Sequence, residues 1–473
     1  MAGPDYIPPD MAPPASFDAP GPVAPADEAA LASWWRRFDD PVLDDLVERA
    51  LAQNIDLKIA ASRIREARLQ EVVAGAAGLP QIGLSAGANN TQFSKNAGLA
   101  SLGSLLGGSG PDSGTGGGIA APGASISTFS AGFDASWELD LLGRARRGRE
   151  AASASTEAAE WTARDAKVSL IAEIADDYLK LRAIEQQSAL LGEQLESAAG
   201  LLRIARTAAE TGLRPGSATF QQQSLIENLQ AQVAANAAQQ KALRRQIAVL
   251  LAVPVDRLPP LVRAPDPERA LAVPTIDPGL PSELLRRRPD IRAAERQLAA
   301  STAQIGVATA DLYPSFSLTG VAELLSTSLA SLVSTDSLQT VAAGSISVPL
   351  FDFGRRRALV GVARERADQS YLVYRKTVIT ALSEVGGALE QFQAERDRAA
   401  ALGNALAAAR RAESSATASY RAGLTDFAPV YQAQIARQDA ASAVLASQAS
   451  QREDLVMLYK ALGGGWGDPA APE

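Results

Sequence analysis

The fold is decided by residues 143–210, which read GRARRGREAASASTEAAEWTARDAKVSLIAEIADDYLKLRAIEQQSALLGEQLESAAGLLRIARTAAE. This segment lacks proline and is rich in Ala, Leu, Arg, Glu and Gln, which are strong helix formers. It predicts one continuous helix of about 68 residues, roughly 100 Å long at ~1.5 Å per residue. Residues 354–421 have the same character and predict a second such helix. Because the mean helix of a globular protein has about a dozen residues, both segments indicate an extended helical architecture.

The two halves of the chain repeat one another. Leu79-Pro80 corresponds to Tyr313-Pro314 at an offset of 234 residues (313 − 79), as Asn54-Ile-Asp-Leu does to Arg288-Pro-Asp-Ile. Further on, Gly143-Arg144 corresponds to Gly354-Arg355 at an offset of 211 (354 − 143). The offset changes once, across a longer Gly/Ser-rich loop in the first half, so the sequence predicts a tandem duplication.

The repeat and the proline-rich segments divide the chain into five parts. The predicted parts are residues 1–39, a Pro-rich arm and short helix; 40–252, the first repeat; 253–281, a Pro-rich linker; 282–465, the second repeat; and 466–473, a C-terminal tail. The first repeat is expected to contain a helix, a β-hairpin at about 80–139, the long helix 143–210 and a return helix 217–252. The second is expected to contain a helix, a hairpin at about 314–351, the long helix 354–421 and a return helix 425–462.

Several element ends have local signals. Asp40-Pro41 predicts a helix start with proline just inside it, and this helix is expected to continue to about Gly75. Ser217 is expected to cap the first return helix, and Asp27 a short helix that contains Trp34-Trp35. The two tryptophans admit two interpretations, a membrane-interface anchor or packing of the short helix on its neighbour, and packing is favoured.

The hairpins are predicted from a change of period. Apolar and polar residues alternate over 129–139, and more weakly over 81–90, with an irregular Gly/Ser-rich loop at 94–125 between them. In the second half, Phe316 and Leu318 alternate with polar residues, as do Ile346, Val348 and Leu350. Such strands match the ~9–11 residues with which a tilted barrel strand crosses a bilayer.

Bulk composition excludes several classes of function. The chain has 473 residues, a net charge of −8, and neither Cys nor His. This removes disulfides, thiolate or imidazole metal sites and His acid–base chemistry, and no other catalytic motif is found, so neither an enzyme nor a cofactor is expected. Acidic residues outnumber basic ones, so the composition does not indicate a basic surface of the kind that binds nucleic acid. No apolar run reaches ~18 residues, so no transmembrane helix is expected. A signal peptide is missing as well, which indicates either a cytoplasmic protein or a processed form.

Two hairpins supply four strands, which cannot close a barrel alone. A β-sheet can cross a lipid bilayer only as a closed barrel, in which every strand edge is paired. Three copies of the chain would supply twelve strands, and their helices would form a second, helical barrel. The alternative is a soluble coiled-coil scaffold or adaptor.

Four stretches carry a family resemblance. Residues 284–295 (LLRRRPDIRAAE), 311–320 (DLYPSFSLTG), 137–144 (WELDLLGR) and 348–355 (VPLFDFGR) resemble the signature stretches of the TolC-like outer-membrane efflux channels, most closely the lipoprotein (NodT/OprM-like) branch. The resemblance covers about residues 3–465. It implies an α+β membrane protein: a homotrimer with a twelve-strand barrel in outer-membrane lipid, a periplasmic α-barrel, and an equatorial region that includes the arm and linker. It also implies a periplasmic adaptor and an inner-membrane RND-type pump as partners, in a Gram-negative bacterium.

The N-terminal motif of that branch is incomplete here. Gly3-Pro4-Asp5-Tyr6 and Pro9 match it, but the lipid-bearing Cys expected just before Ala2 or Gly3 is absent. Our hypothesis is that a signal peptide and this Cys were removed, and that the native form is lipid-anchored.

The resemblance places the gate at the periplasmic helix tips, near 211–220 and 422–434. Gly212 and Gly423 stand at the turns, and Tyr420 matches a tyrosine that ties neighbouring tips together, although the same residue could serve in packing. Many relatives carry Leu and Asp at the narrowest point, where this chain has Ala428 and Gln432. Asp426, one turn away, could supply charge instead or be solvated. A wider or less cation-selective constriction is expected.

The function implied is a passive exit duct for drugs or other small molecules. Within the channel class, a type I protein-export or metal-export duct is the alternative. The sequence does not identify the substrate, the adaptor or the pump.

Overall fold

The computed structural model describes residues 2–11, 28–92, 94, 125–211, 216–258 and 281–467. The chain forms two compact units. Unit 1 contains residues 1–7, 68–154 and 299–368, and unit 2 contains residues 8–67, 155–298 and 369–473.

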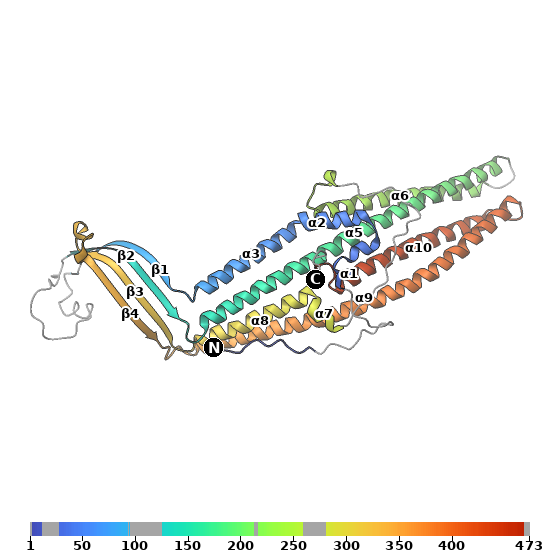
Figure 1. The fold of residues 1–473 in the computed structure, drawn as a ribbon. Coiled ribbons are helices and arrows are strands. Elements are labelled where there is room, and N and C mark those ends of the chain that lie inside the picture. The colour runs from blue at the N-terminus through green and yellow to red at the C-terminus, as the bar shows by residue number, and fades with distance from the viewer. Residues whose placement is uncertain are drawn as a thin grey trace, which may run out of the picture. The chain divides into compact units, whose positions relative to one another are not determined.

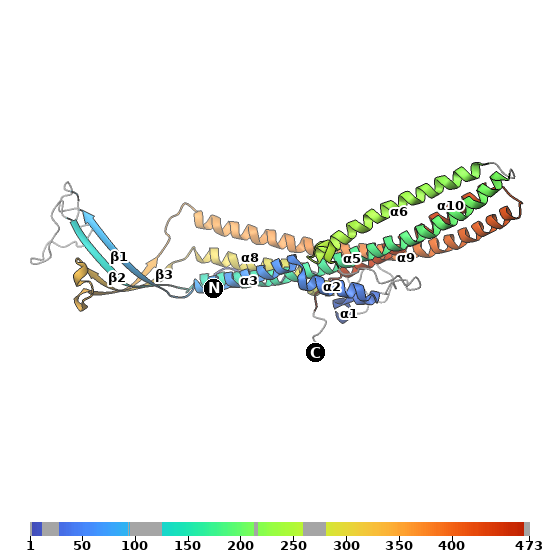
Figure 2. The ribbon, with the colours of Figure 1, turned by 90° about the horizontal axis from the view of Figure 1, so that it is seen from above.

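Unit 1 contains a four-stranded antiparallel sheet of order β1-β2-β3-β4 (Figures 1 and 2). Its strands are β1 (Gln81–Gln92), β2 (Ser125–Leu139), β3 (Ser315–Ser326) and β4 (Leu338–Ser347). The two predicted hairpins therefore join through β2 and β3, where Phe133 lies opposite Ala322. Strands β1 and β4 each pair on one side, so each keeps a free edge among the described residues.

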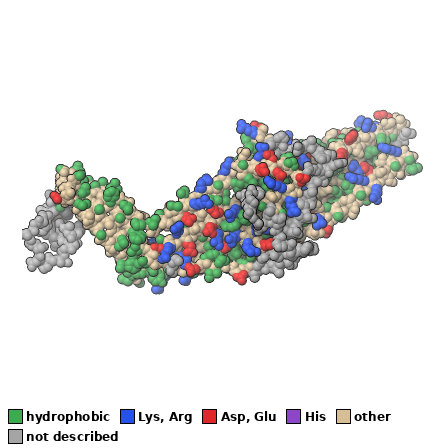
Figure 3. All heavy atoms as spheres, in the orientation of Figure 1, with side chains coloured by type: hydrophobic (Ala, Val, Ile, Leu, Met, Phe, Trp, Pro, Cys, Tyr) green, Lys and Arg blue, Asp and Glu red, His purple; other side chains and the backbone are tan. Residues whose placement is uncertain are grey.

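The alternation of apolar and polar residues gives the sheet two unlike faces. Cross-strand partners such as Leu84 and Phe133, or Phe316 and Ile346, bring most of the large apolar residues of the four strands to one face. Much of this face is exposed in the single chain, with Leu84 74 % accessible. The described strands contain three ionisable residues, all acidic: Asp134, Glu138 and Glu323, all in register on the other face. In Figure 3 charged side chains spread over the helices, whereas the visible part of the sheet shows mainly hydrophobic and uncharged ones.

The last strand is shorter than its sequence pattern indicated. β4 ends at Ser347, so Val348 and Leu350 follow the strand instead of belonging to it. Pro349 between them has no N–H to donate to a ladder, which explains the early end. The β3–β4 connection contains two short 3₁₀ turns, η3 (Leu329–Ser331) and η4 (Thr335–Ser337).

The helices confirm the internal repeat in length and in spacing. α3 (Ile55–Ala76) and α8 (Pro289–Ala310) have 22 residues each, and their starts differ by 234 (289 − 55). α5 (Arg144–Glu210) and α9 (Arg355–Arg421) have 67 each, with starts 211 apart (355 − 144). The return helices α6 (Ser217–Leu250) and α10 (Ala428–Ala461) have 34 each, again 211 apart (428 − 217).

The helix predicted from residue 40 to Gly75 is broken. α2 (Pro41–Gln53) and α3 are separated by Asn54, whose ψ of 135° is not helical. The Asn54 side chain accepts from the Leu57 N–H at 3.0 Å and donates to the Leu250 carbonyl at 2.9 Å. Local capping thus competes with helix continuation. Its counterpart Arg288 separates α7 (Pro281–Arg287) from α8 in the second half.

Other ends differ by a few residues. The predicted start at Asp40-Pro41 is confirmed, with the Asp40 carboxylate accepting from the Val42 N–H at 3.0 Å. Ser217 is not the cap of α6, because Gly216 occupies that position without a side-chain bond. α10 begins at Ala428 and not at 425, because Pro429 sets the first turn. Asp27 lies outside the described residues.

The main core of unit 2 gathers around Trp34. The 3₁₀ helix η1 (Trp34–Phe38) follows α1 (Glu28–Ala32) and begins with Trp34, which is fully buried and stacks on Tyr459 at 4.8 Å. Trp35 is also buried, so the packing interpretation holds for both tryptophans. The same core contains four residues of α5 that recur at three-four-three spacing along one helix face, Ile171, Ile174, Tyr178 and Leu181.

None of the described helices combines the length and the apolarity that a membrane span requires.

Candidate functional site

The turn between α9 and α10, here called the tip, closes with a left-handed glycine as predicted. Gly423 has φ of 74°, its N–H donates to the Tyr420 carbonyl, and the Leu424 N–H donates to the Ser419 carbonyl, both at 3.0 Å. These two bonds form a Schellman motif, which ends a helix and reverses the chain. Gly212, the expected counterpart, lies outside the described residues.

The Tyr420 side chain, at the end of α9, is buried beside the tip and is not exposed on the surface. It is 8 % exposed, and its ring meets Phe427 edge-on in a cluster with Leu201, Ala218 and Val430. The cluster joins the end of α5 and the start of α6 to the α9–α10 turn. The packing role foreseen for Tyr420 is therefore present within the chain.

The three residues expected at the constriction are all exposed. Ala428 and Gln432 lie one helical turn apart on the first turns of α10, and Asp426 precedes that helix. Their exposure leaves them available to face a pore, and no charge stands at 428 or 432.

The sequence interpretation missed a polar layer beneath the tip. Gln222 of α6 and Gln434 of α10 are both fully buried, and the Gln222 Nε2 donates to the Gln434 Oε1 at 3.0 Å. Nearby, Arg437 pairs with Glu413 at 2.6 Å, and burial raises the pKa of Glu413. Gln222 and Gln434 lie at similar positions near the starts of the two return helices. This correspondence between the repeats is the sequence signal from which the pair could have been predicted.

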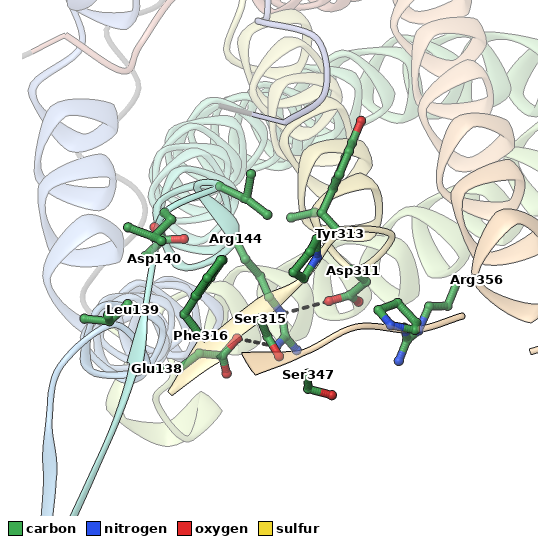
Figure 4. A pocket seen from close by; sticks show the side chains of 15 residues that line it. Glu138, Leu139, Asp140, Arg144, Asp311, Tyr313, Ser315, Phe316, Ser347 and Arg356 are labelled. Carbon is green, nitrogen blue, oxygen red and sulfur yellow. Dashed lines mark hydrogen bonds and ion pairs between the residues drawn. The ribbon is translucent and has the colours of Figure 1, made fainter. Parts of the chain in front are cut away.

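A small pocket of about 120 Å³ lies in unit 1 where the strands meet the helices. Arg144, the first residue of α5, bridges Glu138 at 3.3 Å and Asp311 at 3.1 Å (Figure 4). Figure 4 shows Tyr313 pointing away from this triad. The two ion pairs thus tie the end of β2 to the turn before β3, although their exposure limits each to about 1 kcal/mol or less.

The N-terminal motif lies against the same part of unit 1. The Ala2 N–H donates to the Leu142 carbonyl at 2.9 Å, and Arg147, almost fully buried, pairs with Asp5. Gly3 has φ of 81°, and a Cβ at Gly306 would lie 2.7 Å from the Arg147 side chain. Glycine at both places lets the arm approach α8 closely.

A larger cavity of about 580 Å³ lies in unit 2, lined by α5, α9, α10 and the start of α8. Arg288 lines this cavity and forms ion pairs with the carboxylates of Asp290 at 2.7 Å and Glu384 at 2.8 Å. Asp165 faces the same cavity, where burial and then Asp290 raise its pKa. Asn54 and Arg288 each separate two helices at equivalent positions of the repeat, but only Arg288 carries a charge.

Comparison with known sequences assigns the family. The outer membrane efflux protein family matches residues 46–253 and 280–464. The pyoverdine export outer membrane protein OpmQ of Pseudomonas putida is 32 % identical and covers 97 % of this chain and 94 % of its own. Nodulation protein T of Rhizobium leguminosarum bv. viciae is 28 % identical over 99 % of this chain and 91 % of its own.

Solved structures agree in fold. The outer-membrane channel OprN has a TM-score of 0.88 at 32 % identity, covering 98 % of this chain and 99 % of its own. The open state of the Neisseria gonorrhoeae MtrE channel has a TM-score of 0.84 at 27 % identity, with 98 % of each chain covered. The α+β channel fold and the four sequence stretches thus lead to the same assignment, and the chain belongs to the outer membrane efflux protein family as an exit channel of the outer membrane.

Proposed function

We propose that three copies of the chain form the duct, with β4 of one copy pairing β1 of the next. The observation that carries this proposal is the open sheet, in which the first and last of the described strands each have a free edge. An unpaired edge is costly in lipid, and pairing each β4 with a neighbouring β1 removes all edges. Four strands from each of three copies make twelve.

The two faces of the sheet fit that assembly. The apolar face, with exposed Leu84 and Phe133, would meet lipid tails, and the acidic, polar face would line the lumen. Helix α3 supports the same arrangement, because it has no buried residue in the single chain although Leu69, Val72 and Val73 form an apolar stripe. A neighbouring copy would cover that stripe.

The duct would be passive and gated at the tips. The proposed periplasmic gate consists of Tyr420, Gly423, Asp426, Ala428 and Gln432, together with Gly212 at the other turn. A periplasmic adaptor and an inner-membrane RND-type pump would engage the tips and supply the energy, without a catalytic step in this chain. The relatives include proteins named for pyoverdine export and for antibiotic efflux, which favours small molecules as substrates.

The strand seam can be tested directly because the chain has no cysteine. Ala86 of β1 and Ala342 of β4 both belong to the apolar face near mid-strand. In the Ala86→Cys, Ala342→Cys double variant, a bifunctional thiol cross-linker should give a covalent trimer on a denaturing gel, and the purified protein should conduct in planar bilayers.

Each single-cysteine variant serves as a control, since neither can link more than two copies. A double variant that stops at monomer, with no conductance, would contradict the duct and favour the scaffold interpretation. Longer covalent ladders beyond three copies would contradict the closed ring.

A further inference from the structure

Unit 2 contains a charge that nothing in the described chain balances. Arg452 of α10 is 2 % exposed, and its one hydrogen bond to a described residue is from Nη1 to the Gln186 Oε1 at 3.4 Å. Among the described residues no carboxylate lies within ion-pair distance of it, and its Nε has no acceptor. Burying an unpaired ionic group costs several kcal/mol, and arginine cannot escape by losing its proton.

A second guanidinium stands beside it. Arg182 precedes Gln186 by one turn on α5, so both side chains lie on the face that meets Arg452. Burial, and then the positive charge of Arg182, lower the pKa of Arg452. The Nε of Arg182 is likewise buried without an acceptor, so two neighbouring cations each present an unused N–H donor.

Among the described residues, one carboxylate, that of Glu185, lies beside these cations and already forms two ion pairs. Glu185 lies 3.4 Å from Arg182 and 3.6 Å from Arg244, and burial raises its pKa despite both cations. The arginine layer, defined as Arg182, Arg244, Arg452 and Glu185, therefore contains three cations and one anion among the described residues. It lacks negative charge at the contact between α5 and α10.

We propose that the arginine layer binds a small inorganic anion of the chloride type between Arg182 and Arg452. Such an anion accepts from both unused Nε–H groups and offsets the repulsion between the two guanidiniums. Because Arg452 is almost fully enclosed by its own chain, a small ion fits the place better than a carboxylate side chain of another copy. The site joins α5 of the first repeat to α10 of the second.

The test compares anions at constant ionic strength. The full chain in an uncharged detergent is melted in sodium chloride and in sodium gluconate, whose anion is too large for an enclosed site. Chloride should raise the melting temperature saturably, by about 3 °C when well above its dissociation constant. In crystals soaked in bromide, an anomalous peak should lie between Arg182 and Arg452.

Two variants separate this site from surface effects. Arg452→Gln removes the unbalanced charge and should lose the difference between chloride and gluconate, as should Arg182→Gln if the first variant folds poorly. Arg245→Gln, at an exposed position of α6, should keep it. Equal melting temperatures of the wild type in both salts, or a chloride effect that survives in both arginine-layer variants, would overturn the proposal.

Discussion

The ring of Tyr420 packs edge-on against the ring of Phe427, with centroids 5.4 Å apart and 72° between the planes. Tyr420→Ala removes this contact and leaves a cavity in the tip cluster, so we expect the opening free energy of the turn to fall by about 3 kcal/mol. Hydrogen–deuterium exchange of residues 416–431 measures this change. Tyr420→Phe keeps the ring and is the matched control.

The same pair tests the gate. If Tyr420 also holds neighbouring tips, Tyr420→Ala should raise single-channel conductance while Phe427→Ala, which affects the packing alone, should raise it less. Equal conductance in both variants would assign Tyr420 to packing only.

A charge can be introduced at Gln432, a position proposed for the constriction. This exposed residue of α10 is neutral, so Gln432→Asp should create a ring of three carboxylates in the proposed trimer and make the channel cation-selective, with block by divalent cations. Reversal potentials in a salt gradient measure the selectivity. Gln432→Asn is the neutral control, and strong cation block in the wild type that Asp426→Asn relieves would move the constriction to Asp426.

Asp177 of α5 should make stability depend on pH. Burial, and then the neighbouring Asp176 and Glu173 carboxylates, raise its pKa to about 6 despite Lys180. Because the unfolded value is about 3.9, the folded protein prefers the protonated form, and the stability that this group contributes at low pH is lost as pH rises through 6. Asp177→Asn should raise the melting temperature at pH 8 and change it little at pH 4.

Asp439→Asn, at an exposed position of α10, is the control for that experiment. It should leave the melting temperature unchanged at both pH values. A stabilising effect of Asp177→Asn that is as large at pH 4 as at pH 8 would contradict a titration near 6.

The ends of the two return helices offer a backbone test. Ala252 has φ of 54° after α6, and its counterpart Gly463 has φ of 70° after α10. The N–H groups of residues 252 and 253 close the same pair of bonds as those of 463 and 464. A left-handed alanine costs about 1 kcal/mol or more, partly offset by the greater unfolded-state freedom of glycine.

Ala252→Gly should therefore raise the melting temperature slightly, and Gly463→Ala should lower it by more. In the second variant the new Cβ would also lie 3.1 Å from the Arg288 side chain. Calorimetry of both variants gives the comparison, and a loss of stability in Ala252→Gly would show that the strain is absent.

The sequence predicted the elements that depend on local pattern and missed those that depend on partners far along the chain. Both long helices follow from composition, and β2 from alternation, although it starts at Ser125 because the strand pairs with Gln92. The break at Asn54 was missed because its stabilising acceptor, the Leu250 carbonyl, is 196 residues away. The buried Gln222–Gln434 bond and the isolated charge of Arg452 likewise arise only when the two repeats pack.

The equal lengths of the paired helices in the two halves have an evolutionary consequence. A half-length ancestor with one hairpin would have needed six copies for twelve strands, and every tip would have been the same. Fusion of two halves lowers the number of separate subunits to three and gives the halves independent sequences. The positions equivalent to Ala428 and Gln432 are Ser217 and Gln221, so the two sets of tips already differ at one of these positions, and each set can evolve separately toward the proposed gate or the proposed partner contacts.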